Sequence, residues 1–193
     1  MLAPVRTVAP TLTPISLEEA RAQCKIDSND EDELLSALID AATSHLDGYS
    51  GTLGRALITQ TWRQDFDCFE DVLRLRVGDL VAVSSVSYYD TSNVSQTLAT
   101  TVYTAFSDEA GPFVTLKPDQ TWPGSYVRED AVRVTWTAGY GSAATSVPAA
   151  IRQAMLLMIS HWYDNRGVAV MGSVADLPFA VDALLSPFRR RGV

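Results

Sequence analysis

Hydrophobic and polar positions change their period twice along the chain, and each change marks a different kind of element. Apolar residues recur at helical spacing near the N-terminus, in short β-branched and aromatic runs from residue 57 to 140, and at helical spacing again from Ile151. The pattern predicts two helices, a β-rich block, a long helix and a short final helix.

The first two helices are predicted from capping signals and an apolar stripe. Ser16-Leu17-Glu18-Glu19 is a capping box that opens a short helix ending near Ile26. Asp30 is predicted to cap the second helix, whose first turn is acidic, because the helix dipole favours negative charge there. Gly48 and Gly51 end this helix. Its expected buried stripe comprises Leu34, Leu35, Leu38, Ile39, Ala42, Leu46 and Tyr49.

The β-rich block consists of six predicted strands separated by residues typical of turns. Turns are expected at Gly78-Asp79, Asp90–Asn93, Gly111-Pro112 and Trp122-Pro123-Gly124. The predicted strands are Thr59–Phe66, Val72–Val77, Leu80–Tyr89, Thr97–Phe106, Phe113–Leu116 and Ala131–Thr137.

The last strand passes through a glycine turn into the long helix. Val132, Val134 and Trp136 alternate with polar residues, which predicts a half-buried strand. Gly139-Tyr140-Gly141 is interpreted as a turn, because it lacks the lysine and the spacing of a phosphate-binding loop. Pro148 fits the first turn of a helix that ends at Arg166. A final short helix starts at Asp176-Leu177-Pro178 and is stopped by Pro187.

This order of elements predicts an α+β fold in which a β-rich subdomain is inserted into a bundle of helices. The bundle is expected to combine the two N-terminal helices, helix 148–166 and the short C-terminal helix, and the inserted β strands are expected to be antiparallel. We expect an extended arm at 1–15, a helical core from 16–56 and 142–175, a β-rich insertion at 57–141, and a C-terminal helix with an arginine tail at 176–193.

Composition and charge narrow the function classes. The chain has 193 residues, 47% of them hydrophobic, which is enough for a real core in one domain with an insertion. No apolar run approaches the ~20 residues of a membrane span. Met1–Thr13 has one charge and no compact apolar stretch, so a secretory signal is not expected.

The net charge of −8 is concentrated near the N-terminus. Ser16–Asp47 holds nine acidic residues and only two basic ones, whereas the last residues carry Arg189, Arg190 and Arg191. General DNA binding needs positive charge to neutralise phosphates, so it is not expected here. A solvated helix face is the simplest interpretation of the acidic stretch.

Candidate chemistry is sparse, and we expect neither enzymatic activity nor a cofactor. His45 and His161 have no second ligand one helical turn away, which argues against a metal site. Asp65, Asp67, Glu70 and Asp71 miss the spacing of a calcium loop, so a solvated hairpin tip is favoured. Two buried thiols at Cys24 and Cys68 are favoured over a disulfide, and the four tryptophans are expected in the core.

What remains are candidate interface residues. Trp162, Tyr163 and Arg166 close the long helix, and these residue types are enriched at binding hot spots. The alternative is that Trp162 belongs to the core and Arg166 caps the helix C-terminus. Asp176–Val193 is too short to fold alone, so it docks either on its own domain or on a partner.

The chain resembles the phage head–tail connector, or adaptor, family, in its longer members with a β-rich insertion. The resemblance covers nearly the whole chain through the order and spacing of short motifs. They are Ser16-Leu17-Glu18-Glu19-Ala20, Tyr88-Tyr89-Asp90, the Val-Thr-Trp-Thr-Ala-Gly-Tyr-Gly of 134–141, Val147-Pro148 with Ile151-Arg152-Gln153-Ala154, His161-Trp162-Tyr163 with Asn165-Arg166, Leu177-Pro178, and Leu184-Leu185 with Pro187-Phe188-Arg189.

The resemblance implies structural work in the particle of a tailed phage, a prophage or a gene transfer agent. Such adaptors form a ring, twelve-fold in the particle, between the portal protein and a tail-proximal stopper or tail terminator protein. DNA passes through the ring without specific binding. The expected location is therefore the head–tail junction of a virion or virus-like particle made in a bacterial cytoplasm, with no membrane partner.

Three site hypotheses and one alternative function follow. Portal binding is assigned to Leu177, Phe179, Leu184, Leu185, Phe188, Arg189, Arg190 and Arg191. A subunit interface is assigned to Trp162, Tyr163 and Arg166, and acids of the lumen or of an interface are Glu31, Asp32, Glu33 and Asp40. The alternative function is a binding module, in which the β subdomain recognises protein or carbohydrate on a helical base.

Overall fold

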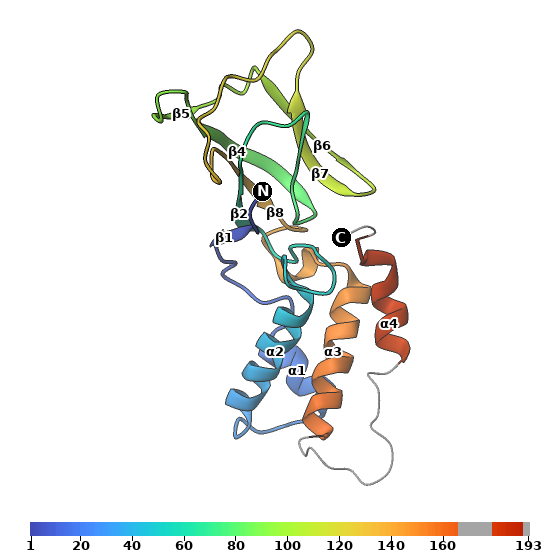
Figure 1. The fold of residues 1–193 in the computed structure, drawn as a ribbon. Helices are drawn as coiled ribbons and strands as arrows, with labels where there is room; N and C mark the ends of the chain where they lie inside the picture. Colours follow the sequence, from blue (N-terminus) through green and yellow to red (C-terminus); the bar gives the residue numbers. More distant parts are fainter. Residues whose placement is uncertain (166–178, 191–193) are drawn as a thin grey trace.

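The computed structural model, which describes residues 1–165 and 179–190, has a helical body below a β body (Figure 1). The expected α+β fold, with helices and antiparallel strands, is confirmed. In the part described, the helical body contains α1 (Leu17–Cys24), α2 (Asp32–Leu46), α3 (Ala149–Asp164) and α4 (Phe179–Leu185), with 3-10 turns at Ala144–Ser146 and Ser186–Phe188.

The β body contains two antiparallel sheets. The five-stranded sheet has the order β1-β2-β8-β4-β5, and the three-stranded sheet has the order β3-β7-β6. The strands are β1 (Val5–Val8), β2 (Gln60–Phe66), β3 (Val72–Arg74), β4 (Leu80–Tyr89), β5 (Ser95–Thr97), β6 (Tyr103–Asp108), β7 (Gly111–Leu116) and β8 (Val132–Ala138).

The helical core is built largely by the long helix α3. Its buried residues recur at the spacing of one helix face, and they are Ile151, Ala154, Met155, Met158 and Ile159. They pack with a face of α2 that buries Leu35, Ile39, Ala42 and Leu46. Val181 and Leu185 of α4 complete this core, so the C-terminal helix is part of the bundle.

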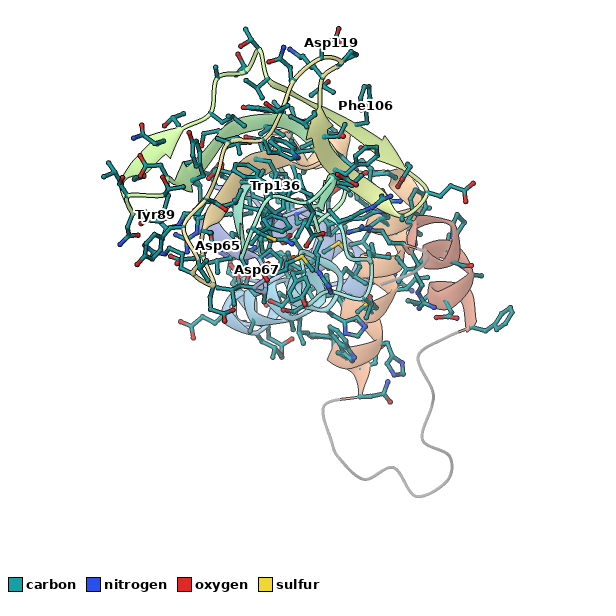
Figure 2. The ribbon with its side chains drawn as sticks, turned by 45° about the horizontal axis from the view of Figure 1, so that its top comes forward. Asp65, Asp67, Tyr89, Phe106, Asp119 and Trp136 are labelled. Atoms are coloured by element: carbon teal, nitrogen blue, oxygen red, sulfur yellow. The ribbon has the colours of Figure 1, made fainter. Side chains whose placement is uncertain are left out.

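The β core lies around β8, which is the central strand of the larger sheet. Val132, Val134, Trp136 and Ala138 are fully buried and alternate with partly exposed residues, as the sequence predicts. Trp136 stands opposite Trp62 of β2 in the register. Trp136 lies in the interior of the β body (Figure 2), where the two sheets enclose a common apolar cluster.

Capping confirms one sequence prediction and corrects another. The Ser16 side chain accepts from the Glu19 N–H, and the Glu19 carboxylate accepts from the Ser16 N–H at 2.9 Å, so the capping box is present. A cap at Asp30 would start the second helix at Glu31, but the helix starts at Asp32. Its N-cap is Glu31, which makes no side-chain capping bond, because the Glu31 carboxylate accepts from Tyr163 instead.

Three strand predictions are wrong in extent. The run 97–106 is not one strand: Thr97 ends β5, the Val102 N–H bonds to the Ala99 carbonyl and closes a turn, and β6 begins at Tyr103. The strand predicted from Val72 to Val77 ends at Arg74. Gly111 and Pro112 begin β7, so the turn before them lies at residues 109 and 110.

The N-terminal arm is extended, but it does not stand apart. Val5–Val8 forms β1, which pairs antiparallel with β2 at the edge of the larger sheet. The β body is therefore assembled from residues outside 57–141 as well. Cys24 and Cys68 are not bridged to each other, and Cys68 is exposed instead of buried.

Candidate functional site

The residues proposed for a subunit interface lie at the end of α3, against the helical core. Trp162 is half-buried on that core. The Tyr163 hydroxyl donates a hydrogen bond to the Glu31 carboxylate at the start of α2. Arg166 lies outside the described residues. Both described side chains thus make contacts within the chain, and their role between subunits stays a prediction.

The four acids proposed for the lumen or an interface fall into two groups. Glu31 accepts from Tyr163, and Asp32 pairs with Arg21, whose Nε donates to Asp32 Oδ1 at 2.8 Å. Glu33 and Asp40 are exposed on α2. The second pair is therefore the one that presents negative charge to the surroundings.

The C-terminal segment docks on its own domain over the part described. α4 packs along α3, and it buries Val181 and Leu185. Phe179, by contrast, is 89% exposed, and Arg189 pairs with Asp182 at the surface at 2.6 Å. A helix of seven residues gains stability only through such packing. Leu177 and Arg191 lie outside the described residues.

This packing changes the set of side chains available for a portal. Leu185 is buried and Arg190 bonds to carbonyls of the β body, so both are already engaged within the chain. Leu184 and Phe188 are half-buried against the helical core. Phe179 is the most exposed described apolar member of the predicted set.

A cluster of charged side chains joins the two bodies, and sequence reasoning missed it. We call Asp47, Arg55, Asp79, Tyr140 and Arg190 the junction cluster. Arg55 donates from Nη1 to Asp79 Oδ1 at 2.7 Å and from Nε to the Phe188 carbonyl at 2.6 Å. Arg55 thereby ties the loop after α2 to the turn before β4 and to the C-terminal segment.

Burial raises the pKa of three members of the junction cluster, Asp79, Tyr140 and Asp47. Burial raises the pKa of the Asp79 carboxyl, although the Arg55 guanidinium opposes this. Burial, with the neighbouring Asp79 charge, raises the pKa of Tyr140 to about 12. Burial likewise raises the pKa of Asp47, whose carboxylate accepts from the Leu57 N–H at 2.7 Å and from Gln60 Nε2 at 2.9 Å. The hydrogen bonds of Asp47, Arg55 and Arg190 connect the two bodies.

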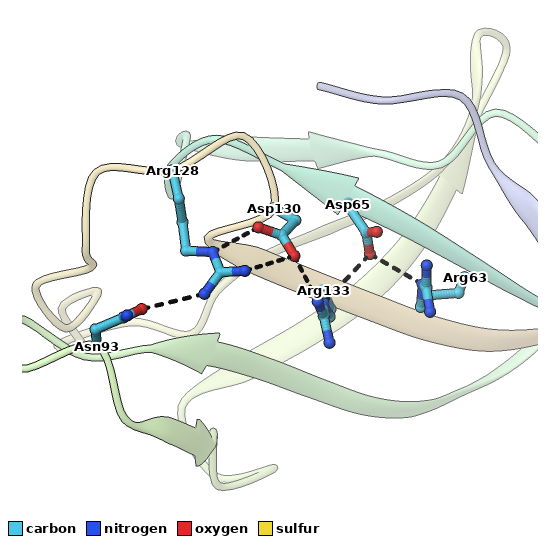
Figure 3. Close-up of polar contacts among 6 residues, drawn as sticks. All are labelled: Arg63, Asp65, Asn93, Arg128, Asp130 and Arg133. Carbon is cyan, nitrogen blue, oxygen red and sulfur yellow. Dashed lines mark hydrogen bonds and ion pairs between the residues drawn. The ribbon is translucent and has the colours of Figure 1, made fainter.

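A second charged network lies along the larger sheet near β5 (Figure 3). Arg128 and Arg133 both donate to Asp130, and Arg128 Nη1 also donates to Asn93 Oδ1 at 3.1 Å. The hydrogen bonds from the two guanidiniums lower the pKa of Asp130 to about 2. The Arg128 guanidinium carbon lies 3.7 Å from the centroid of the Tyr89 ring.

The acids Asp65, Asp67, Glu70 and Asp71 do not converge on a calcium site. Asp65 Oδ1 lies 3.1 Å from Arg63 Nε and 3.9 Å from Arg133 Nε. Figure 3 draws both ion pairs. Asp67 pairs instead with the N-terminal ammonium at 3.3 Å. Across residues 1–165 and 179–190, no group of three or more His, Cys, Asp or Glu side chains is placed to hold a metal ion. In the same ranges, no helix is long and apolar enough to cross a membrane.

Large apolar side chains are exposed at several separate places, among them the β body, the N-terminal arm and α4. On the β body, Phe106 projects from the β6–β7 hairpin and is 55% exposed (Figure 2), and Val127 is 94% exposed. Val127 borders an open depression of about 540 Å³ that also includes Asp67, Cys68 and Arg128. The N-terminal arm exposes Met1, Leu2, Val5, Val8 and Leu12. On α4, Phe179 is exposed.

Comparison with known families and structures shows what this chain is similar to. Residues 14–102 match the family of phage gp6-like head-tail connector proteins. The resemblance expected from the sequence is thereby confirmed over this range, which includes the capping box and Tyr88-Tyr89-Asp90 but not the motifs after residue 102. No curated protein matches the chain in sequence.

Three solved structures share the fold over the full chain, each covering 100% of this chain and 97% of its own. The first is the neck of an empty gene transfer agent particle computed with C6 symmetry, with 20% identity and a TM-score of 0.79. The second is the virion of a native gene transfer agent particle, with 21% identity and a TM-score of 0.78. The third is the neck of the native particle computed with C12 symmetry, with 21% identity and a TM-score of 0.73.

Proposed function

We propose that this chain, whose residues 14–102 match the phage head–tail connector family, is a structural adaptor subunit of the neck of a tailed-phage-like particle. In this proposal it forms a ring between the portal and a tail-proximal protein, and the ring is a conduit for DNA. The observation that carries the proposal is the full-length fold similarity to chains of particles whose necks were determined. A structural and not a catalytic role agrees with both comparisons.

Ring formation is proposed from the symmetry of those particles, which were computed with C6 and C12 symmetry. A ring uses heterologous contacts, in which two different surfaces of each subunit meet. The exposed apolar side chains of the N-terminal arm, Val5, Val8 and Leu12, are candidates for one of these surfaces. Such a subunit is expected to be monomeric alone and to close into a ring on the portal.

The conduit role is supported by charge. A net charge of −8 repels the phosphates of DNA, which favours sliding of the duplex over retention. Glu33 and Asp40 are the exposed members of the proposed lumen acids. Reversing both charges to lysine is expected to slow DNA ejection from assembled particles. If DNA retention and ejection are unchanged, Glu33 and Asp40 do not face the lumen.

The portal-binding surface is proposed to be the outer side of α4, centred on Phe179. Truncation at Asp176 is a poor test, because it would take Val181 and Leu185 out of the helical core. The substitution Phe179→Ser changes an exposed side chain and leaves that core intact. Phe106→Ser is its matched control, since Phe106 is also an exposed aromatic residue but lies on the β body.

The test is co-expression with the portal protein encoded beside this chain, read by negative-stain microscopy and mass photometry. A ring on the portal with the unmodified chain and with Phe106→Ser, but not with Phe179→Ser, is the expected result. Loss with Phe106→Ser alone would move the docking surface to the β6–β7 hairpin. No association of the unmodified chain would overturn the adaptor role, and the β body would then be screened for protein and carbohydrate ligands.

A further inference from the structure

The last described residue, Arg190, connects the C-terminal segment to the β body. Where α4 ends, the chain lies at the level at which the two bodies meet (Figure 1). The Arg190 N–H donates to the Leu53 carbonyl at 3.4 Å, and its Nη1 donates to the Arg76 carbonyl at 2.7 Å. Its Nη2 donates to the Ala110 carbonyl in the turn between β6 and β7. One side chain thus holds carbonyls from two separate loops of the β body.

Three glycines from three separate segments surround the Arg190 side chain: Gly54 in the loop after α2, Gly78 in the β3–β4 turn and Gly111 at the start of β7. A Cβ atom added to Gly54 or Gly78 would lie 3.4 Å or 3.2 Å from Arg190 Cδ. A Cβ added to Gly111 would lie only 2.0 Å from Arg190 Nη2, which is impossible without displacing the guanidinium. Gly111 also has a φ of +118°, which only glycine adopts readily. The missing side chains of Gly78 and Gly111 therefore provide space that Arg190 fills, and Gly54 borders this space at ordinary van der Waals distance.

The chemistry of this space fits a guanidinium and not an ammonium. The guanidinium is a planar fork, and its separate nitrogens Nη1 and Nη2 reach the Arg76 and Ala110 carbonyls, whereas an ammonium has a single nitrogen. Two cavities of about 450 and 260 Å³ adjoin Arg190. Burial and the nearby Arg55, Arg74 and Arg76 lower the pKa of Arg190, whereas the Asp79 charge favours its charged form.

A second hydrogen bond, from Arg55, also fixes the C-terminal segment at the junction. Arg55 donates to the Phe188 carbonyl, two residues before Arg190, and also pairs with Asp79. The C-terminal segment is therefore fixed to the junction at two successive points. Neither contact could be inferred from sequence, because Arg55 and Phe188 are separated by 133 positions.

We propose that Gly54, Gly78 and Gly111 form a guanidinium socket, and that Arg190 in this socket is a latch that couples α4 to the β3–β4 turn and the β6–β7 hairpin. Lifting α4 from the bundle withdraws Arg190 and frees both loops. If α4 binds the portal, a step that rests on the proposed function, portal binding and the position of the β body are linked through this latch.

The latch is tested on the full isolated chain by hydrogen exchange, without a portal, so its failure is separate from failure of the adaptor role. Arg190→Ala is expected to speed amide exchange about tenfold in residues 76–80 and 108–112, since hydrogen bonds from a charged donor are lost. Arg189→Ala is the matched control, because Arg189 pairs only with exposed Asp182 among the contacts described. Exchange at Leu35 and Ile39 of α2 reports whether the fold is retained.

Chemical rescue distinguishes a guanidinium site from general packing. Millimolar methylguanidinium is expected to restore slow exchange in Arg190→Ala, and methylammonium is not. Arg190→Lys is expected to behave as Arg190→Ala does. Equal rescue by both ions, or full protection in Arg190→Lys, would overturn the guanidinium socket. If amide exchange in residues 76–80 and 108–112 is as slow in Arg190→Ala as in Arg189→Ala, the latch is overturned.

A double-mutant cycle tests the glycines. Gly78 is chosen because its φ is not in the positive range, so Gly78→Ala adds a Cβ 3.2 Å from Arg190 Cδ and 3.3 Å from Arg55 Cγ without backbone strain. Only the part of the effect that passes through Arg190 is expected to depend on the Arg190 background. Gly78→Ala is expected to speed exchange in residues 108–112, and the effect is expected to be about threefold smaller in the Arg190→Ala background. Additive effects of the two substitutions would show that Gly78 does not line the socket.

Discussion

Arg6 Nη1 donates a hydrogen bond to Asp47 Oδ2 at 3.0 Å, and this contact fastens the first strand to the end of α2. The Asp47 side chain is only 4% exposed. Its other oxygen accepts from the Leu57 N–H and from Gln60 Nε2. One carboxylate thus joins the N-terminal arm, the helical body and the start of the β body.

Removal of this carboxylate is expected to be costly. Asp47→Ala leaves the Leu57 N–H, the Gln60 amide and the Arg6 guanidinium without their shared acceptor. The free energy of unfolding in urea is expected to fall by roughly 3 kcal/mol. Asp40→Ala, an exposed change on the same helix, is expected to stay within about 0.5 kcal/mol. A similar small change in both variants would contradict the role of Asp47.

Loss of the capping box at the start of α1 is expected to destabilise the fold less than loss of the Asp47 carboxylate. Ser16→Ala removes the acceptor for the Glu19 N–H and is expected to lower the free energy of unfolding by about 1 kcal/mol. Ser36→Ala, at an exposed position within α2, is the control and is expected to be neutral or slightly stabilising. Chemical denaturation of both variants measures the difference, and equal stabilities would argue against capping.

The Arg128–Asp130–Arg133 network predicts an acid-sensitive contribution to stability. The pKa of Asp130 is lowered from 3.8 to about 2 in the folded chain. The stabilisation is therefore fully present above pH 3.8 and is lost as the pH falls through about 2. Asp130→Asn is expected to be less stable than the unmodified chain at neutral pH. Urea titrations from neutral pH downward should show this gap shrinking with acid, and a constant gap would contradict the assignment.

Trp136 tests the packing of the β core. It is fully buried in the central strand β8, opposite Trp62. Trp136→Ala is expected to cost about 3–5 kcal/mol, since the large cavity removes many packing contacts. Phe106→Ala serves as a control because that ring is more than half exposed, and it is expected to change stability by less than about 1 kcal/mol. Calorimetric melting of both variants measures the difference.

Local sequence patterns predicted the elements well where one face is consistently buried. The buried positions of α3 and the alternation of β8 follow directly from periods of 3.6 and 2. The run 97–106 misled the strand prediction because its residues favour strands throughout. Only the fold places Leu98 in the β core and turns the chain after it.

The sequence by itself determined the order of helices and strands, the capping box, the acidic character and the resemblance to the connector family, because each is written in neighbouring residues. Tertiary structure decided where the charged side chains pair and which parts of the C-terminal segment stay exposed. Arg6, Asp47, Arg55, Asp79 and Arg190 are distant in the chain, and no local period links them. They meet only because the packing of two bodies brings their loops to one junction and excludes water from it.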